Sequence, residues 1–486
     1  MIKKLFRNKQ FKYLMLMTLL FAAIFASIAK FSPNARAAIP LVGDEPSYMG
    51  IADSLYHFHT PNLTSELQTK RYRNFYFQDI SLDQVTTSET KNFPKHGIGW
   101  SLILAPLFAI SNDPRIWAIL LQNAIMTLLI LNVFLWLREA GHNFWLSLFV
   151  PLALSLTIPL SIQTYELFSE PIAALCLVYA LRKFEKPNIV SIVAVAFLPW
   201  IHIKYLVFYP ILFWPVIKTM LIWLRLALTK IFTKSKRLAL RANLSKNVSD
   251  SDIRSKWLII SITAASLIVL AIFNNYAYGT PLSAQEKAGS FFSNLGGLIG
   301  SLVNRSNGLF SYAPIYILIF LGYGALWTKN RNLFWKAFLV PVTLWFVNGI
   351  FESWHGGQAA PARMILSVLP IFAIPLAEVL ALPFKWLFRG IFMIFLAPSI
   401  YLGLVGRWEP VMIINRNLFE GLNGFRRVTR FPFDWERFFP LTHHFNWANV
   451  GWAIAFIVMF VLGYLLAKNH RSLEKLNETI DHYPGI

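Results

Sequence analysis

Long apolar segments separated by short polar ones run along almost the whole chain. A helix of about 20 apolar residues crosses the roughly 30 Å hydrocarbon core of a membrane. The pattern therefore predicts an all-α polytopic membrane protein with about 12 transmembrane helices. We expect these helices near residues 13–31, 115–137, 144–162, 166–182, 189–203, 205–224, 257–275, 309–327, 333–351, 364–384, 388–405 and 447–467.

One apolar segment does not fit this series. The stretch "HGIGWSLILAPLFAIS" (96–111) is too short to span comfortably, and counting it as a span would invert every later loop. We interpret it as a re-entrant or interfacial helix, which leaves 37–114 as one large outer loop. The chain then divides into a transmembrane region 1–405 that includes this loop, an outer loop 406–446, and a last transmembrane helix with a cytoplasmic tail, 447–486.

Composition agrees with a membrane protein. The 486 residues are 56% hydrophobic and only 14% charged, whereas a typical soluble domain has about 25% charged residues. The single cysteine, Cys176, lies in an apolar run, which excludes a disulfide framework and a cysteine metal site. A basic flank precedes the first span, and we interpret that span as an uncleaved signal anchor, although "NARAA" would suit cleavage of a signal peptide.

The formal net charge of +21 follows the predicted topology. With the N-terminus in the cytoplasm, the cytoplasmic segments hold roughly 27 of the 45 Lys and Arg, and the outer segments hold about 16 of the 24 acids. The charge is therefore mainly a positive-inside signal, compatible with contact to anionic lipids, and it gives no support to nucleic-acid binding. We predict a multi-pass protein of the cell (plasma or inner) membrane with both termini in the cytoplasm.

Two adjacent acids, Asp44 and Glu45, follow the first span in "LVGDEPSYMG". Pro46 suits the first position of a helix, so one of these acids is placed to cap that helix near the positive end of its dipole. Two interpretations stay open. Either the acids are structural caps, or an ionised carboxylate serves as a general base or a metal ligand.

Further polar residues lie at the outer ends of two later spans. In "TYELFSEP", Glu166 and Glu170 are one helical turn apart, and an acid in a membrane usually faces a wet cavity; Glu170 can equally cap a helix. In "WIHIKY", Lys204 can extend to the headgroups or hold a phosphate as a point charge. His202 alone is more often a hydrogen-bonded interfacial residue than a ligand.

A third polar region is "FESWHGGQAAPARMILSVLP", which contains Trp354, His355, two glycines and Arg363. The glycines allow close backbone approach, and the Arg fork fits a phosphate, although Arg363 could also be a plain interface anchor. Lys95 and His96, in "FPKHGIGW", face the same compartment. Together these segments collect acids and cations at one membrane surface, where a lipid phosphate and a hydrophilic substrate could meet.

The order of these motifs resembles the GT-C glycosyltransferases. After the first span come "GDEPSYMGIADSL", "KHGIGWSLILAPLFA", "YELFSEPIAAL", "LPWIHIKY", "NRSNGLFSYAPIYIL" and "WHGGQAAPARMILSVLP". The most similar type is that of the protein O-mannosyltransferases and lipid A aminoarabinose transferases, which use a polyprenyl-phosphate sugar. The resemblance extends over about residues 10–375, and the C-terminal third is similar only in being helical.

The resemblance implies a GT-C-like fold with in-plane helices in the first outer loop, and inverting transfer of a sugar on the outer face of the membrane. By position, it implies the catalytic acids Asp44, with Glu45 as the alternative, and Glu170. Implied ligands of the donor phosphate are Lys204, Arg363 and Lys95. The substrate pocket would include His96, Tyr165, His202, Trp354 and His355. Asn304 stands where relatives often carry an Asp, which removes one possible acid.

The implied chemistry suits these residue types. An attacking hydroxyl needs one base, for which Asp44 is the candidate, while a phosphate leaving group needs cations more than a proton donor. A divalent metal ion is an open alternative source of that positive charge, with Glu170 and His202 as its candidate ligands. The expected partners are a polyprenyl-phosphate-linked sugar donor, a lipid, glycan or protein acceptor, and membrane lipids.

Two other functions remain as alternatives. An O-antigen polymerase or ligase type would use Arg and His of a large late loop, and the arginine-rich loop 406–446 fits that requirement. A transporter or flippase of lipid-linked sugars would carry charged residues deep inside its spans, where we find few beyond Glu378.

Overall fold

The computed structural model describes most of the chain. The described residues are 18–19, 41, 43–80, 85–88, 91–94, 96–222, 250–281, 295–351, 354–356, 360–408, 439–440 and 447–482. The predicted first span (13–31) and the outer loop 406–446 therefore lie almost wholly outside the described residues. The described part is helical apart from one two-stranded hairpin, as the apolar pattern predicts.

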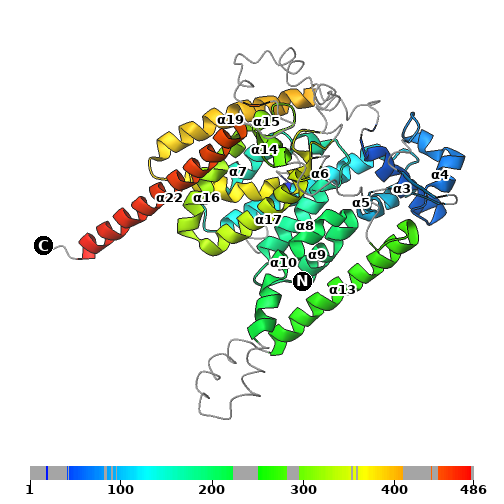
Figure 1. Ribbon diagram of the computed structural model, residues 1–486, viewed down its shortest axis with the longest axis horizontal. Helices are drawn as coiled ribbons and strands as arrows, with labels where there is room; N and C mark the ends of the chain where they lie inside the picture. Colours follow the sequence, from blue (N-terminus) through cyan, green and yellow to red (C-terminus); the bar gives the residue numbers. More distant parts are fainter. Residues whose placement is uncertain are drawn as a thin grey trace, which may run out of the picture.

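The region between the first predicted span and the second forms a small unit of short elements at one end of the molecule (Figure 1). Its elements are α3 (Glu45–Phe58), α4 (Thr64–Thr69), η2 (Arg71–Asn74), β1 (Val85–Ser88), β2 (Lys91–Pro94), α5 (Gly99–Leu104) and η4 (Ala105–Ala109). The strands pair antiparallel, with Ser88 opposite Lys91. The unit has its own core around Trp100, which is fully buried and donates its indole N–H to Leu167 O at 2.8 Å.

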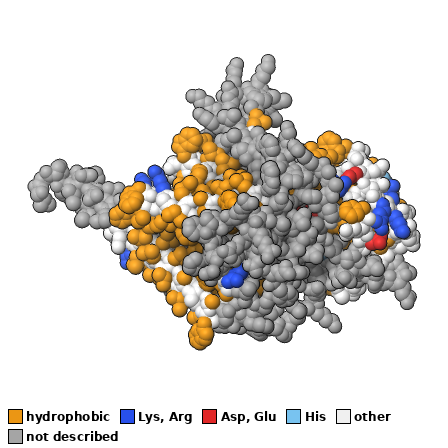
Figure 2. Space-filling view, turned by 90° about the horizontal axis from the view of Figure 1, so that it is seen from above, with side chains coloured by type: hydrophobic (Ala, Val, Ile, Leu, Met, Phe, Trp, Pro, Cys, Tyr) orange, Lys and Arg blue, Asp and Glu red, His pale blue; other side chains and the backbone are white. Residues whose placement is uncertain are grey.

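Longer helices build the body of the molecule. They are α6 (Arg115–Glu139), α7 (Phe144–Ser155), η5 (Ile162–Thr164), α8 (Glu170–Arg182), α9 (Ile189–Ile201), η6 (Ile203–Phe208), α10 (Tyr209–Leu212), α13 (Asp250–Tyr278), α14 (Leu295–Val303), α15 (Leu309–Tyr312), η7 (Pro314–Leu318), α16 (Ile319–Lys329), α17 (Arg331–Gly349), η8 (Arg363–Phe372), α18 (Ala373–Leu380), α19 (Lys385–Trp408) and α22 (Trp447–His482). Hydrophobic side chains cover much of this body, whereas acidic and basic side chains gather over the end that carries α3 and α4 (Figure 2).

Several of these helices are long and apolar enough to cross a membrane, which indicates a multi-pass membrane protein. Within the described residues there are five such helices, or six if a pair bent by 42° counts as one span. They are Arg115–Glu139, Trp257–Tyr278, Arg363–Leu380, Lys385–Gly406 and Trp447–Ser472, with the bent pair Ile203–Leu212 and Trp214–Ile222. The described residues do not show the larger number of about 12 spans predicted from the sequence, and that number stays a prediction.

Some predicted spans are broken into shorter elements. The span expected at 144–162 ends as a helix at Ser155, and the span expected at 309–327 consists of α15, η7 and α16. Proline explains the interruptions, since Pro159 and Pro314 each remove a backbone donor and clash with the preceding turn. The segment 96–111 forms α5 and η4, so the short helix predicted there is confirmed, while its orientation in a membrane stays a prediction.

The body is held together by close helix contacts. Helices α16 and α22 pack against each other at two reciprocal glycine positions. A Cβ on Gly324 would overlap Phe460 O of α22, and a Cβ on Gly463 would overlap Leu321 O of α16. Small residues at such crossings let two backbones approach closely, which is a main source of helix association within a membrane.

Candidate functional site

Asp44 lies directly before α3, at the point where the small unit of short elements, Glu45–Ala109, meets the body of the molecule. Gly43 precedes it with φ at +55°, a left-handed backbone that glycine adopts without strain. Pro46 then starts the helix, as expected from the sequence. However, Asp44 occupies the N-cap position without a capping hydrogen bond from its carboxylate, so the prediction that Asp44 or Glu45 caps this helix is not supported for Asp44. Its side chain keeps 21% of its surface exposed and turns toward the body.

The partner of Asp44 is Arg363, the first residue of η8. The Nη2 atom of Arg363 lies 2.5 Å from Asp44 Oδ2, and its Nε donates to Glu170 Oε1 at 3.0 Å. The guanidinium also lies over the ring of Phe168, with 3.6 Å between Cζ and the ring centroid. A planar group with several N–H donors in a fixed geometry suits such a bridge. One buried arginine thus joins two of the acids predicted to be catalytic.

Local structure fixes the positions of both Glu170 and Arg363. Glu170 opens α8 and is followed by Pro171, so its carboxylate lies near the positive end of the helix dipole. Ala362 precedes Arg363 with φ at +57°, in the left-handed region that disfavours a side chain by roughly 1–2 kcal/mol. Its backbone N–H donates to Asn307 O at 3.1 Å, which helps to hold this conformation.

Two histidines and a lysine border the acids. His96 Nε2 lies 3.4 Å from Asp44 Oδ1, and His202 Nδ1 accepts a hydrogen bond from the backbone N–H of Lys204 at 3.1 Å. The loop that carries His96 rests directly on the end of α9, because a Cβ at Gly97 would overlap the carbonyl oxygen of Ile201. This contact explains why a residue before α5 reaches the end of a span about a hundred positions later.

Lys204 differs from Arg363 in having no acidic partner. Its charge interacts with Glu170, Arg363 and Asp44, yet in the described part of the chain no carboxylate lies within ion-pair distance of its Nζ. The ammonium lies over the ring of Tyr205, with 5.4 Å from Nζ to the centroid. Lys204 is therefore available to bind an added anion.

The ionisation of Asp44 is set by its neighbours. Burial raises the pKa of this carboxyl, but the positive charge of Arg363, together with His96 and His202, outweighs burial and holds the pKa well below its usual range. Asp44 is therefore ionised at neutral pH. The same pairing makes it a weak base for as long as Arg363 stays in contact with it.

Glu45, the alternative catalytic acid, has a different environment. It is buried, and its Oε1 accepts a hydrogen bond from the backbone N–H of Leu167 at 2.5 Å. That bond ties the start of α3 to the segment before α8. Adjacent acids therefore have separate roles, since Glu45 joins two segments while Asp44 faces the cations.

Three predicted pocket residues make contacts in other parts of the described structure. Tyr165 donates its hydroxyl to Gly406 O at 3.3 Å and packs in a separate apolar group with Ile158. Trp354 is buried against α14, where a Cβ on Gly297 or Gly300 would press into its indole ring. His355 contacts the ring of Trp354, with 5.9 Å between centroids. Lys95, predicted to bind the donor phosphate, lies outside the described residues.

Other residues of the site escape sequence reasoning. Phe168 supplies the ring under Arg363, and the Tyr48 hydroxyl lies 3.3 Å from Ser169 Oγ in a buried contact. Burial, with Asp44 and Glu170 nearby, raises the pKa of Tyr48 well above its usual value, so it stays a neutral donor. The sequence marks Tyr48 only as one of several apolar positions at helical spacing, and it carries no signal for Phe168.

The residues present do not form a metal centre by themselves. Within the residues that the structure describes, no group of three or more His, Cys, Asp or Glu side chains could hold an ion. One Glu170 oxygen is occupied by Arg363, although Oε2 is buried without a hydrogen-bond partner. His202 already uses Nδ1 to accept a backbone hydrogen bond. We therefore derive no step through a metal.

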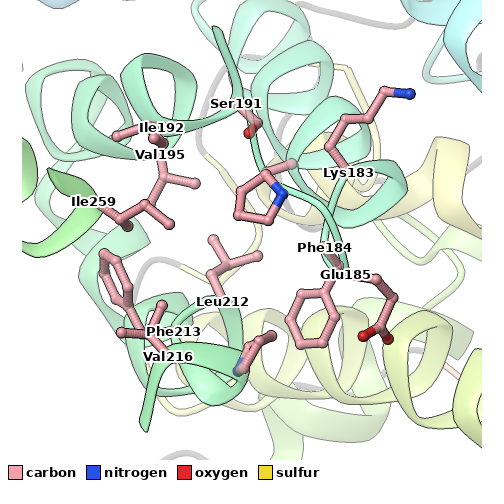
Figure 3. A pocket seen from close by; sticks show the side chains of 13 residues that line it. Lys183, Phe184, Glu185, Ser191, Ile192, Val195, Leu212, Phe213, Val216 and Ile259 are labelled. Atoms are coloured by element: carbon pink, nitrogen blue, oxygen red, sulfur yellow. The ribbon is translucent and has the colours of Figure 1, made fainter. Parts of the chain in front are cut away.

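A cavity of about 40 Å³ lies elsewhere, among α8, α9, α10 and α13 (Figure 3). Its wall is mostly aliphatic and aromatic, and the Lys183 ammonium points away from it. Glu185 at its edge lies 2.6 Å from Lys336 Nζ and also accepts a hydrogen bond from Asn332. Its acid is already paired, and the hydroxyl of Ser191 on its wall is bonded to the backbone of Asn188, so this cavity is a packing gap. The cluster around Arg363 is the candidate site.

Comparison of the chain with models of protein families, with curated proteins and with solved structures finds no match.

Proposed function

We propose that this multi-pass membrane protein is a glycosyltransferase that moves a sugar from a polyprenyl-phosphate donor to an acceptor hydroxyl. The observation that supports this proposal best is the Asp44–Arg363–Glu170 bridge, with Lys204 beside it. It combines acids and cations from segments far apart in the sequence, at the end of the spans that carries the small outer unit. A reaction between a lipid phosphate and a hydrophilic acceptor requires such a combination at such a place.

In the proposed reaction, the acceptor oxygen attacks the anomeric carbon from the side opposite the phosphate. The new C–O bond forms as the bond from the anomeric carbon to the phosphate oxygen breaks, and the phosphate leaves with the electron pair. Asp44 takes the proton of the attacking hydroxyl, and Lys204 and Arg363 stabilise the charge that develops on the leaving phosphate. The anomeric configuration is inverted, because the reaction is a single displacement.

The bridge also suggests how donor binding activates the base. Asp44 is weakly basic while Arg363 neutralises it, and a donor phosphate would compete with Asp44 for the guanidinium. Once Arg363 contacts the phosphate, the pKa of Asp44 rises toward the range of an effective base. On this proposal Arg363 makes proton abstraction depend on the presence of the donor.

The finer architecture belongs to the same proposal. We propose a GT-C-like arrangement of about 12 spans, in which α3, α4 and α5 lie near the membrane plane on the outer face. Both termini are then cytoplasmic, and the acceptor is a lipid, a glycan or a protein on the outer side. The polyprenyl tail would lie between spans, which explains why such an enzyme is embedded in the membrane.

The test is transfer of radiolabelled sugar from a panel of polyprenyl-phosphate sugars, with the full-length protein in membranes. We expect transfer from at least one donor by the wild type and its loss in Asp44→Asn, which keeps the size of the side chain and removes its charge. Asp113→Asn is the matched control, because Asp113 is also an acid paired with an arginine but lies outside the cluster. Transfer by Asp44→Asn at the wild-type rate would exclude Asp44 as the base. Absence of transfer from every donor would favour the polymerase or transporter alternative.

A further inference from the structure

A second cavity, larger than the one in Figure 3, lies between α7 and α19. Its volume is about 460 Å³, within the range of roughly 300–1,000 Å³ that is usual for ligand sites. Its wall is formed by Asn143, Trp145, Leu146, Phe149, Leu380, Arg389, Phe392 and Met393. Two of these eight residues, Asn143 and Arg389, are polar, and both lie near the first residues of their helices.

This groove lies at the opposite end of the spans from the Asp44 cluster. Leu380 ends the candidate span that Arg363 begins, and this span joins the 3₁₀ helix η8 to α18, so about 30 Å of helix separates the groove from the bridge. Trp145 and Trp386 beside the groove keep 75% and 76% of their surface exposed. Exposed tryptophans at the end of a span are typical of the level of the lipid headgroups. The groove therefore opens at a membrane interface and continues along α7 and α19 into the apolar layer.

The polar end of the groove carries unneutralised positive charge. Arg389 lines it, and Lys385 lies one helical turn earlier on α19. In the part of the chain that the structure describes, neither forms an ion pair with an acid. Glu378 of α18, the helix that supplies Leu380 to the wall, is already occupied, since its carboxylate lies 2.9 Å from Lys329 Nζ and 3.2 Å from His142 Nε2.

The other end of the groove is apolar and partly aromatic. The rings of Phe149 and Phe392 lie 6.1 Å apart, and Met393 adds a flexible side chain that adapts to an irregular surface. An occupant must therefore carry a negative group at Arg389 and an apolar chain along the two phenylalanines. A free anion would leave the apolar part empty, and a neutral lipid would leave the cations unpaired.

We propose that this groove binds an anionic glycerophospholipid of the leaflet opposite the Asp44 cluster. Its phosphate lies against Arg389 and Lys385, and one acyl chain follows Phe149, Phe392 and Met393. Basic pockets between spans recognise anionic headgroups in this way. The proposal does not depend on the enzymatic function, because the site shares no residue with the Asp44 cluster.

The test is native mass spectrometry of the full-length protein, purified in detergent and titrated with phosphatidylglycerol or with phosphatidylcholine. We expect the wild type to bind phosphatidylglycerol at least about tenfold more tightly, and Arg389→Gln to lose most of that preference. Met393→Trp, which fills the apolar end of the groove, should weaken binding of both lipids. Arg331→Gln is the matched control, because Arg331 is exposed, lies at the start of another helix and does not line the groove.

Three results would overturn the proposal. The first is equal affinity of the wild type for the two lipids. The second is an unchanged preference in Arg389→Gln. The third is an equal loss in Arg331→Gln, which would mean that net charge rather than this groove attracts the lipid. Circular dichroism and elution volume establish that each variant is folded, and all three variants replace side chains that are exposed.

Discussion

Arg363 Nη2 lies 2.5 Å from Asp44 Oδ2, although 319 positions separate the two residues in the chain. This contact joins the small unit that begins with α3 to the body of the molecule, because Asp44 precedes α3 and Arg363 begins a candidate span. Glu170 Oε1 accepts a hydrogen bond from Nε of the same guanidinium at 3.0 Å. The bridge is therefore a structural link as well as a candidate site, and the two roles give different predictions.

Replacing Arg363 should destabilise the fold strongly. In Arg363→Gln, Asp44 and Glu170 would face each other without their cation, and Glu170 is buried. Removing one partner of a buried ion pair typically lowers the free energy of unfolding by about 3–5 kcal/mol. The double variant Arg363→Gln/Glu170→Gln should regain part of that loss, measured by thermal unfolding in detergent. An Arg363→Gln protein as stable as the wild type would contradict the burial of this pair.

Replacing Lys204 should act on the donor and spare the fold. Lys204 has no acidic partner within ion-pair distance among the described residues, so Lys204→Gln breaks no salt bridge. A hydrogen bond to a charged group contributes about 1.5–3 kcal/mol, which corresponds to a roughly 10- to 150-fold rise in KM for the donor. Lys204→Arg should restore most of the affinity, and Lys183→Gln at the other end of the spans should change nothing. Unchanged KM and unchanged kcat in Lys204→Gln would contradict the proposed role of Lys204 at the donor phosphate.

The Asp44–Arg363 pair should also determine how stability depends on acid. Because the folded state lowers the pKa of Asp44 below its ordinary value of 3.8, its stabilising effect is complete above that value. The effect is lost as the pH falls through the folded-state pKa. We therefore expect Asp44→Asn to unfold at a lower temperature than the wild type at pH 7, with a smaller difference below about pH 4. In the Arg363→Gln background the same substitution should stabilise, because it then removes an unpaired charge; a constant difference at all pH values would contradict this account.

Part of this site could be predicted from the sequence. The motifs that contain Asp44, Glu170, Lys204 and Arg363 all lie at predicted span ends on one side, and the structure brings these four residues together. Topology alone places them near one surface. The pairing of Arg363 with two acids depends on tertiary packing, and no local pattern encodes it.

The position of Tyr165 could not be derived from the sequence, because the backbone around it is irregular. Tyr165 lies between η5 and α8, where the side-chain direction follows no helical period, and its hydroxyl donates to Gly406 O. The apolar pattern of a segment likewise does not reveal the helix breaks at Pro159 and Pro314, because it depends only on which residues are hydrophobic. The long uninterrupted helices α6 and α19 were predicted to within a few residues.

The contact between α16 and α22 should tolerate no side chain at its glycines. A Cβ on Gly324 overlaps the backbone of α22, so Gly324→Ala should separate the two helices and lower the free energy of unfolding by about 1–3 kcal/mol. Gly451→Ala on α22 is the matched control, because nothing lies within 4 Å of its Cβ position. That control should be neutral or slightly stabilising, since alanine favours a helix over glycine. Thermal unfolding of the two variants decides the matter, and equal midpoints would contradict the close crossing.

Glu66, in α4 of the small unit Glu45–Ala109, should make this unit less stable as the pH rises. It is fully buried, and its closest charged neighbour is Asp53, which already pairs with Arg71 at 3.1 Å. Burial, followed by the effect of Asp53, raises the pKa of Glu66 from its ordinary 4.5 to about 9. A group with a raised folded-state pKa favours folding fully below its unfolded value, and this advantage disappears as the pH rises toward the folded value.

The wild type should therefore lose stability between about pH 4.5 and pH 9, and Glu66→Gln should remove that slope because the amide does not ionise. The variant would then be the more stable protein at pH 8, while the two proteins would differ little near pH 4. Glu66→Asp is the matched control, since it keeps a buried carboxyl and should keep the slope. Thermal midpoints measured across this pH range give the answer, and parallel curves for wild type and Glu66→Gln would show that Glu66 is not the group that titrates.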